Sequence, residues 1–498
     1  MNAMSLDYWR SKATDLSIES RAFIDGRYVG ALSGETFDCI NPANGRALTK
    51  IAACDTEDVD VAVRSARRAF ESGTWSRMAP ADRKKRLLRF AELMLEHREE
   101  LALLESLNVG KPITNALTGD IPNSAACIQW YAEAIDKLYG EIAPTPSDMT
   151  AMLLREPLGV VAAVVPWNYP LSMASWKLGP ALAAGNSVVL KPAEQSPLTA
   201  IRIAQLAMEA DLPPGVLNVV PGFGETAGRA LGLHMDVDVV GFTGSTEVGK
   251  LFMQYAGQSN IKRVSLECGG KSPHIVLADC SDLDAAARAV AMGIFNNQGQ
   301  VCNAGSRLIV EAKIERDLVD RVVAIGKELE PRDPLDPATK LGAIVSREQL
   351  DRVVGYVEDG KSQGAHLRLG GHRVLEETGG YGADFTFEAT GLVGVMRQAV
   401  ESARMGWGLC TVCGVAGRGE TLDVIPRFLI TGRRIAGSSF GGVKGRDGVP
   451  RLVDMWLDGK IDVDPFISHH ITLDEVNHGF ELMEAQDGIR SVIGFGAA

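Results

Sequence analysis

The middle of the chain alternates short apolar runs with amphipathic segments. From Gly159 onward four runs rich in β-branched residues appear, each followed by a stretch with helical spacing of apolar residues: V-V-A-A-V-V-P-W, S-V-V-L-K-P, V-L-N-V-V-P-G and V-D-V-V-G-F-T-G. Strands that are apolar on both faces and joined by helices are typical of parallel βαβ units. The pattern therefore predicts an α/β fold around a buried parallel sheet.

The flanking segments extend this organisation. Residues 57–137 carry apolar residues at three- and four-residue intervals, which predicts helices. Residues 140–154 turn extended and polar, as in an excursion or an edge hairpin. Two further helices are predicted over 313–330 and 346–363.

A second alternating section follows residue 380. Strands are predicted within A-D-F-T-F-E-A-T-G, G-L-C-T-V-C-G-V-A and R-R-I-A-G-S-S-F-G-G, and helices over 392–405, 447–459 and 474–485. This order predicts half of another doubly wound, Rossmann-like sheet.

The composition excludes several classes of protein. With 51 basic and 63 acidic residues the formal charge is -12, which disfavours binding to nucleic acid or to anionic membranes. No stretch reaches the ~18 apolar residues of a membrane helix, and the start lacks a basic region followed by an apolar core. Eight scattered cysteines favour reduced thiols over a disulfide framework. We expect a cytoplasmic protein.

Polar residues follow the predicted strands at the edge where such sheets bind ligands. They are Trp167 and Asn168 after the first strand, Lys191 and Glu194 after the second, and the turn G-S-T-E-V-G after the fourth. The turn opens a helix, where free backbone N–H groups suit a pyrophosphate. It is not a G-x-G-x-x-G fingerprint, so an ordinary N-capped helix also explains it. Lys191 with Glu194 can likewise be a surface ion pair, and Asn168 a turn former.

Glu267 and Cys302 are a candidate base and nucleophile. Glu267 ends an apolar run before Gly269-Gly270, and Cys302 lies among small and polar residues 35 positions later. A cysteine is a good nucleophile when its surroundings favour the thiolate, and a partly buried glutamate can act as a base at neutral pH. Two-step acyl chemistry requires both groups. The alternative is a buried, inert cysteine.

Five motifs in order resemble the aldehyde dehydrogenase superfamily over residues from about 20 to 380. They are P-W-N-Y-P-L, K-P-A-E-Q-S-P, G-F-T-G-S-T-E-V-G, L-E-C-G-G-K-S-P and G-Q-V-C. The segment W-N-Y-P-L-S-M-A-S-W-K resembles sequences of the branch that oxidises betaine aldehyde and ω-aminoaldehydes. The resemblance implies a Rossmann-type cofactor domain and a catalytic α/β domain, with NAD as cofactor and a small aldehyde as substrate.

The resemblance also implies catalytic roles. Cys302 would attack the aldehyde carbon, and Asn168 with the Cys302 backbone N–H would hold the oxyanion. Glu267 would activate the water that hydrolyses the thioester. Lys191 and Glu194 would hold the adenosine ribose hydroxyls, and the carboxylate would favour NAD by repelling a 2′-phosphate. The same resemblance assigns to the cofactor site Trp167, Gly244, Ser245 and Gly249.

Tyr169 and Trp176 match two members of the aromatic cage that this branch uses for cationic aldehydes, since π faces attract ammonium groups. Asn296 stands where some members place a further tryptophan. Trp176 can also be an ordinary core residue on a helix face.

Residues from about 380 to 495 instead resemble the carboxyl-terminal part of zinc alcohol dehydrogenases of the glutathione-dependent formaldehyde dehydrogenase class. The changeover is at T-G-G-Y-G, 378–382. That family's glycine fingerprint and zinc-binding domain have no counterpart here. Cys410 and Cys413 form a C-x-x-C inside a strand, where their side chains would point to opposite faces, so no metal site is predicted. Arg490 matches an arginine that approaches the coenzyme in that family.

These observations predict NAD-dependent oxidation of an ω-aminoaldehyde or betaine aldehyde to the acid through a cysteine thiohemiacetal and thioester. The alternative is an impaired or inactive fusion protein that at most binds NAD. An active zinc alcohol dehydrogenase would require stoichiometric zinc. A dimer or tetramer is expected, although the strand by which the family pairs subunits is missing. The expected domains are an NAD-binding domain (1–140 and 159–266), an oligomerisation excursion (141–158), a partial catalytic domain (267–380) and the alcohol dehydrogenase-like segment (381–498).

Overall fold

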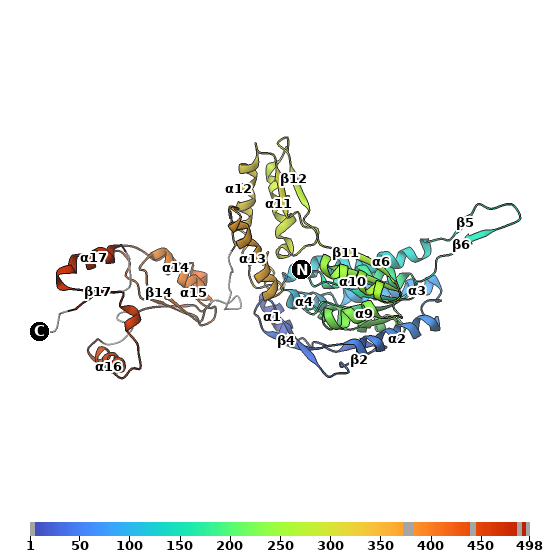
Figure 1. Cartoon of the computed structure of the whole chain (residues 1–498), viewed down its shortest axis with the longest axis horizontal. Coiled ribbons are helices and arrows are strands. Elements are labelled where there is room, and N and C mark those ends of the chain that lie inside the picture. Colours follow the sequence, from blue (N-terminus) through green and yellow to red (C-terminus); the bar gives the residue numbers. More distant parts are fainter. Residues whose placement is uncertain (1–4, 372–382, 439–444, 486–490, 495–498) are drawn as a thin grey trace. The chain divides into compact units, whose positions relative to one another are not determined.

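The chain forms two compact units, Met1–Gly380 and Tyr381–Ala498. The computed structural model describes residues 5–371, 383–438, 445–485 and 491–494 (Figure 1). The predicted changeover at 378–382 lies entirely outside the described residues, in the gap between the first two ranges, and so does Arg490, in a later gap.

A seven-stranded sheet organises the first unit, in the order β11-β10-β7-β8-β9-β1-β2. Neighbours from β11 to β9 pair in parallel, whereas β1 is antiparallel to both β9 and β2. The four predicted strands after Gly159 are therefore confirmed, and the carboxyl ends of the parallel strands share one edge. The strand bounds are β1 Ala22–Ile24, β2 Arg27–Val29, β7 Val160–Val164, β8 Ser187–Lys191, β9 Leu217–Val219, β10 Val239–Gly244 and β11 Arg263–Cys268.

Helices cover both faces of this sheet (Figure 1). Alternate residues of β7 point to opposite faces, so Val161 and Ala163 join one core and Val160 and Ala162 the other. The first core packs on α3 (Pro80–Glu96), α4 (Arg98–Val109), α6 (Ile121–Ala134), α7 (Pro170–Ala183) and α8 (Leu198–Glu209). The second packs on α2 (Thr56–Ser72), α9 (Arg229–Leu233) and α10 (Thr246–Gln258). The helices predicted over 57–137 are confirmed.

Short elements complete this part of the unit. Their bounds are α1 Leu6–Asp15, β3 Thr36–Ile40, β4 Ala47–Ala52, α5 Ile113–Asn115, the π-helical turns η1 Ala116–Asp120 and η3 Gly224–Gly228, and the 3-10 turn η2 Ile135–Lys137. The extended segment at 140–154 forms an antiparallel hairpin of its own, β5 (Glu141–Ala143) with β6 (Ala151–Leu153). This hairpin projects from the unit and is not an edge of the large sheet (Figure 1).

A smaller lobe of the first unit carries the predicted nucleophile. Strands β12 (Pro273–Val276) and β13 (Arg307–Val310) pair in parallel and pack on α11 (Leu283–Phe295) and α12 (Glu315–Lys327), with α13 (Arg347–Ser362) following. The helices predicted over 313–330 and 346–363 are confirmed. The 3-10 turn η4 (Asn296–Gly299) leads into the Cys302 loop.

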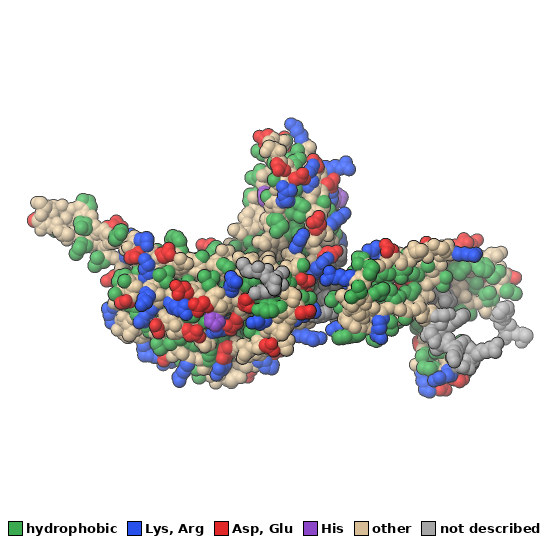
Figure 2. Space-filling model, turned by 180° about the vertical axis from the view of Figure 1, so that it is seen from behind, with side chains coloured by type: hydrophobic (Ala, Val, Ile, Leu, Met, Phe, Trp, Pro, Cys, Tyr) green, Lys and Arg blue, Asp and Glu red, His purple; other side chains and the backbone are tan. Residues whose placement is uncertain are grey.

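The second unit contains a three-stranded parallel sheet in the order β14-β15-β16. Its small core joins Val400, Ala403 and Cys410. Phe385 and Phe387 on β14 are 63% and 70% exposed, and Figure 2 shows hydrophobic side chains over much of this unit's visible face. The bounds are β14 Phe385–Glu388, α14 Val393–Ser402, β15 Leu409–Val412, α15 Pro426–Ile430, β16 Arg434–Gly437, α16 Gly445–Leu457, η6 Asp464–Phe466, β17 His469–Ile471, η7 Leu473–Glu475, α17 Val476–Glu484 and β18 Ser491–Ile493. The predicted strands and helices of this section are confirmed.

Candidate active site

The Cys302 thiol lies on an exposed loop between η4 and β13. The loop is introduced by a left-handed turn, in which Asn297 (φ 49°), Gln298 (φ 57°) and Gly299 (φ 74°) follow one another. Consecutive non-glycine residues in this region are strained, and such strain concentrates at functional sites. The exposed thiol contradicts the alternative of a buried structural cysteine.

Backbone and amide hydrogen bonds join the Cys302 loop to two other segments. Asn168 Nδ2 donates to the Gln300 carbonyl at 2.8 Å. Asn297 Nδ2 donates to the Asn168 carbonyl at 3.0 Å. The Gly270 N–H donates to the Cys302 carbonyl at 3.1 Å. The loop therefore contacts both the Asn168 turn and Gly270, just after Glu267, although these residues lie 134 and 32 positions from Cys302 along the chain.

Glu267 is the penultimate residue of β11, at the carboxyl edge of the large sheet. Its side chain is exposed, and it stands opposite Thr243 of β10 in the parallel register. Lys177 on α7 is close enough to interact with it. Burial lowers the pKa of Lys177, and the negative charge of Glu267 opposes that effect. Lys177 was not singled out from sequence, although it ends the W-N-Y-P-L-S-M-A-S-W-K text.

Lys191 and Glu194 form a partly buried pair at the end of β8. The Lys191 side chain is 3% exposed, and its Nζ donates to the Pro192 carbonyl at 3.0 Å and lies 3.5 Å from Glu194 Oε2. Burial lowers the pKa of Lys191, and the charge of Glu194 partly offsets this. A surface ion pair is therefore the wrong description of Lys191. Its ammonium is held in place beside a carboxylate that remains 35% exposed.

The end of β10 suits an anionic cofactor group. Ser245 is the N-cap of α10, and its Oγ accepts a hydrogen bond from Val248 N–H at 3.2 Å, as in an ordinary capped helix. The preceding Thr243 has a buried Oγ1 without a hydrogen-bond partner. Two glycines here are closely approached by side chains: a Cβ at Gly244 would lie 2.4 Å from Phe242 Cζ, and one at Gly249 3.2 Å from Cys268 Sγ.

Together with Lys191 and Glu194, this donor set fits a dinucleotide. A helix N-terminus favours a pyrophosphate, and a buried ammonium beside a carboxylate suits ribose hydroxyls. Trp167 is half-buried in the turn between β7 and α7. The carboxyl ends of β7, β8 and β10 thus gather the residues that the sequence predicted for this edge.

Trp176 lies on α7, and Tyr169 comes just before this helix. Tyr169 is its N-cap residue, and Lys111 Nζ lies 4.1 Å from the centroid of its ring. Burial raises the pKa of Tyr169 to about 12, with the charges of Asp120 and Cys302 adding to the effect. Trp176 is 56% exposed, so its interpretation as a core residue is wrong. Asn296 lies on η4, six residues before Cys302.

The cysteine pair of the second unit shows no metal site. Cys410 is buried within β15, and Cys413 follows the strand with an exposed side chain. Across residues 5–371 and the three later described ranges, no group of three His, Cys, Asp or Glu side chains could hold a metal ion. Within the same ranges no helix is long and apolar enough to cross a membrane.

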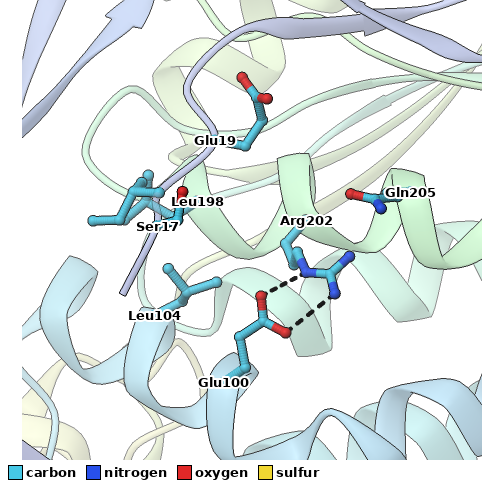
Figure 3. Close-up of a pocket in the computed structure, with 8 residues that line it drawn as sticks. Ser17, Glu19, Glu100, Leu104, Leu198, Arg202 and Gln205 are labelled. Carbon is cyan, nitrogen blue, oxygen red and sulfur yellow. Dashed lines mark hydrogen bonds and ion pairs between the residues drawn. The ribbon is translucent and has the colours of Figure 1, made fainter. Parts of the chain in front are cut away.

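A cavity of about 310 Å³ lies elsewhere in the first unit, lined by the segment before β1 and by α4 and α8. Figure 3 shows Arg202 and Glu100 pointing toward one another there. Arg202 donates from Nε at 2.6 Å and from Nη2 at 3.1 Å to the two carboxylate oxygens of Glu100. None of the predicted catalytic or cofactor residues lines this cavity, so it is separate from the candidate active site.

Known proteins resemble the chain over most of its length. The model of the "Aldehyde dehydrogenase family" matches residues 28–400. The NADP/NAD-dependent aldehyde dehydrogenase PuuC of Escherichia coli is 54% identical over 367 residues, which cover 74% of each chain. The aminoacetaldehyde dehydrogenase of Pseudomonas aeruginosa is 50% identical over 368 residues, again 74% of each.

Solved structures agree with these relatives. An indole-3-acetaldehyde dehydrogenase of P. syringae, AldA, solved with NAD+ and IAA, superposes with a TM-score of 0.75 at 47% identity, covering 89% of this chain and 93% of its own. The predicted fold class, a Rossmann-type domain with a catalytic α/β domain, is thereby confirmed. The sequence match, the shared fold and the joined Asn168, Glu267 and Cys302 segments all lead to one assignment. The chain belongs to the aldehyde dehydrogenase family.

Proposed function

We propose that the protein oxidises an ω-aminoaldehyde or betaine aldehyde to its carboxylic acid with NAD, through Cys302. The E. coli relative is an NADP/NAD-dependent aldehyde dehydrogenase, and the P. aeruginosa relative is an aminoacetaldehyde dehydrogenase. The single observation that carries the proposal is the exposed Cys302 loop, hydrogen-bonded to the Asn168 turn on one side and to Gly270, just past Glu267, on the other. The aminoacetaldehyde dehydrogenase among the relatives favours an amino-substituted substrate.

The groups can divide the chemistry between them. The Cys302 thiolate adds to the aldehyde carbon, and the second Nδ2 hydrogen of Asn168, which Gln300 does not use, stabilises the oxyanion. A bound nicotinamide would supply the hydride acceptor, so that Cys302 would then carry the acyl group as a thioester. Glu267 then takes a proton from the water that attacks the thioester.

The cofactor site follows from the strand ends. Lys191 and Glu194 would hold the adenosine ribose, and the exposed Glu194 carboxylate would repel a 2′-phosphate. The first turn of α10 at Ser245 would face the pyrophosphate, with Gly244 just before it and Gly249 on the same helix. Trp167 would line the same cleft.

Subunit pairing is part of the proposal. The hairpin β5–β6 projects from the first unit with exposed apolar side chains, among them Ile142 at 75% and Met152 at 66%. Exposed apolar patches of this kind mark association sites. We infer that this hairpin holds the protein as a homodimer or homotetramer.

A second candidate is a fusion protein that binds NAD without turnover. Sheet β12–β13 has only two strands among the described residues, and Ile275 and Ile309 on it are 60% and 51% exposed. Phe385 and Phe387 of the second unit are exposed as well. Unpacked strands could misplace Cys302 relative to the cofactor, and an error of about 1 Å can cost about 10²-fold in rate.

Turnover assays separate the two candidates. Purified protein is given NAD with 4-aminobutanal, betaine aldehyde or butanal, NADH formation is followed, and the acid product is identified by mass spectrometry. The proposal predicts acid formation, with kcat/KM higher for the amino-substituted aldehydes than for butanal. NAD binding without any acid from the three aldehydes would contradict it and support the fusion protein.

A further inference from the structure

Three ionisable side chains are buried directly behind the Asn168–Tyr169 turn. Glu105 on α4 is 0% exposed, Lys111 after α4 is 1% exposed, and Asp120 at the end of η1 is 9% exposed. Lys111 Nζ donates to Asp120 Oδ2, and the same ammonium lies 4.1 Å from the centroid of the Tyr169 ring. The aldehyde chemistry proposed above uses none of these three groups.

Glu105 contacts the start of α7 from the same side. Its Oε1 accepts the Leu171 N–H at 3.4 Å, and its Oε2 accepts the Thr199 hydroxyl of α8 at 3.0 Å. Leu171 is the second residue of α7, so this bond holds the helix turn that begins just after Asn168. Ser106, next to Glu105, donates from Oγ to the Lys111 carbonyl at 2.7 Å and fixes the Lys111 backbone.

We propose that Glu105, Lys111 and Asp120 are positioning residues that set the Asn168–Tyr169 turn against Cys302. The Lys111 ammonium forms an ion pair with Asp120 and a cation–π contact with the Tyr169 ring. Glu105 accepts a hydrogen bond from the backbone at the start of α7. A buried cation–π contact and a buried backbone hydrogen bond resist displacement because water cannot replace either. The proposal deepens the function proposed above and rests on it.

Charge balance explains why three ionisable groups can share this site. Burial raises the pKa of Glu105 to about 7; the positive charge of Lys111 lowers it and the negative charge of Asp120 raises it. With Glu105 protonated, one ammonium faces one carboxylate and the group is neutral. Once Glu105 ionises, two carboxylates compete for the Lys111 ammonium, which draws it away from the Tyr169 ring.

The first arm of the test removes the cation. Lys111→Met is compared with Lys111→Met/Asp120→Asn, which removes both charges and so avoids a buried unpaired carboxylate. The matched control is Lys50→Met, whose ion pair with Asp38 is exposed. We expect both Lys111 variants to lose about 10- to 100-fold in kcat on 4-aminobutanal and on butanal alike, with KM within about threefold. A loss confined to one aldehyde, or appearing only in KM, would overturn the proposal.

The second arm uses Glu105→Gln, which mimics the protonated carboxyl group. The ratio of its kcat to that of the wild type should rise at least about threefold as the pH is raised through about 7, because only the wild type gains the second negative charge. A ratio independent of pH would refute the role of Glu105. A merely structural role would lower activity without this dependence.

A third arm does not require turnover. Iodoacetamide alkylation of Cys302, followed by peptide mass spectrometry, reports how the turn lies against the thiol, since the Tyr169 side chain interacts electrostatically with Cys302. Both Lys111 variants should change the alkylation rate at least about threefold relative to Lys50→Met. If the wild-type protein shows no aldehyde turnover but the Lys111 variants change the alkylation rate, the proposed function is refuted and the positioning role is not. Unchanged alkylation in folded variants would refute the positioning role.

Discussion

Replacing Asn168 by alanine tests the oxyanion contact most sharply. An amide Nδ2 carries two hydrogens. One is donated to the Gln300 carbonyl at 2.8 Å, which orients the side chain beside the Cys302 loop. The other remains available to an oxyanion on the carbon that Cys302 attacks. Asn168→Ala removes both hydrogens and leaves the backbone in place.

Loss of the oxyanion contact and loss of the Gln300 hydrogen bond have effects of different size. Removing an oxyanion-hole donor costs about 10²–10³ in kcat, or about 2.7–4 kcal/mol. The Gln300 hydrogen bond contributes only about 1 kcal/mol to folding, and the Gln300 carbonyl keeps a second donor, Asn297 Nδ2 at 3.4 Å. A loss of about 1 kcal/mol lowers Tm by about 2–4 °C in a domain of about 150–250 residues, and by less in a larger unit such as this one. Catalysis should therefore fall far more than stability.

The assay pairs single-turnover NADH formation with thermal unfolding. The control is Asn44→Ala, because Asn44 is exposed and its Oδ1 accepts only the Arg46 N–H of its own loop. We expect Asn168→Ala to lose about 10²-fold or more in the rate of NADH formation at saturating aldehyde. A rate within about threefold of the wild type would refute the oxyanion role, and so would a loss matched by unfolding.

Three further outcomes follow from the same geometry. Glu194→Gln should raise kcat/KM with NADP relative to NAD by about tenfold, measured as initial rates with each cofactor, because the carboxylate that repels a 2′-phosphate is gone. Glu267→Gln should lower the pKa of Lys177 further, since the Glu267 charge opposes the effect of burial on that ammonium; an unmoved Lys177 titration, followed by NMR of the methylated lysine, would contradict this. Met152→Asp should lower the mass in light scattering by one association step, whereas Met253→Asp, also exposed but on α10, should not.

The large sheet could be predicted because its strands are buried on both faces. Val160–Val164 and Ser187–Lys191 are buried along their whole length, so their sequences, V-V-A-A-V and S-V-V-L-K, do not alternate apolar with polar residues. The rule that ligands bind past the carboxyl ends of such strands then indicated Asn168 and Lys191 without any structure. The hairpin at 140–154 was recognisable for the opposite reason, since its turn, P-T-P-S-D, interrupts the core pattern with proline and polar residues.

The pairing of distant segments could not be derived from spacing. Nothing local in the sequence indicates that Asn168 donates to Gln300, 132 positions away, and only the family motifs joined them in advance. Lys111 follows Gly110 and precedes Pro112, which reads as a turn and hides a buried ammonium on the Tyr169 ring. A lysine is almost never fully buried without a partner, and its partner, Asp120, is visible only in three dimensions.

The residues predicted to select the substrate could likewise be named from sequence, but their surroundings could not. Tyr169 was expected to offer its ring to a cationic aldehyde, and the structure adds that the protein's own Lys111 already lies over that ring. Trp176, in contrast, is exposed on α7 and has no such internal cation among the described contacts. The sequence shows which aromatic residues could form a substrate cage. Whether a protein side chain such as Lys111 already contacts one of those rings depends on how α4, η1 and α7 pack together.

A stopped-flow burst of NADH with 4-aminobutanal tests the central claim most directly. Wild-type protein, mixed with NAD and aldehyde, should release NADH up to one equivalent per active subunit before the slower steady state, because hydride transfer precedes hydrolysis of the Cys302 thioester. Cys302→Ala should bind NAD equally well and show no burst. A burst that survives in Cys302→Ala, or its absence in folded wild-type protein that binds NAD, would contradict the account.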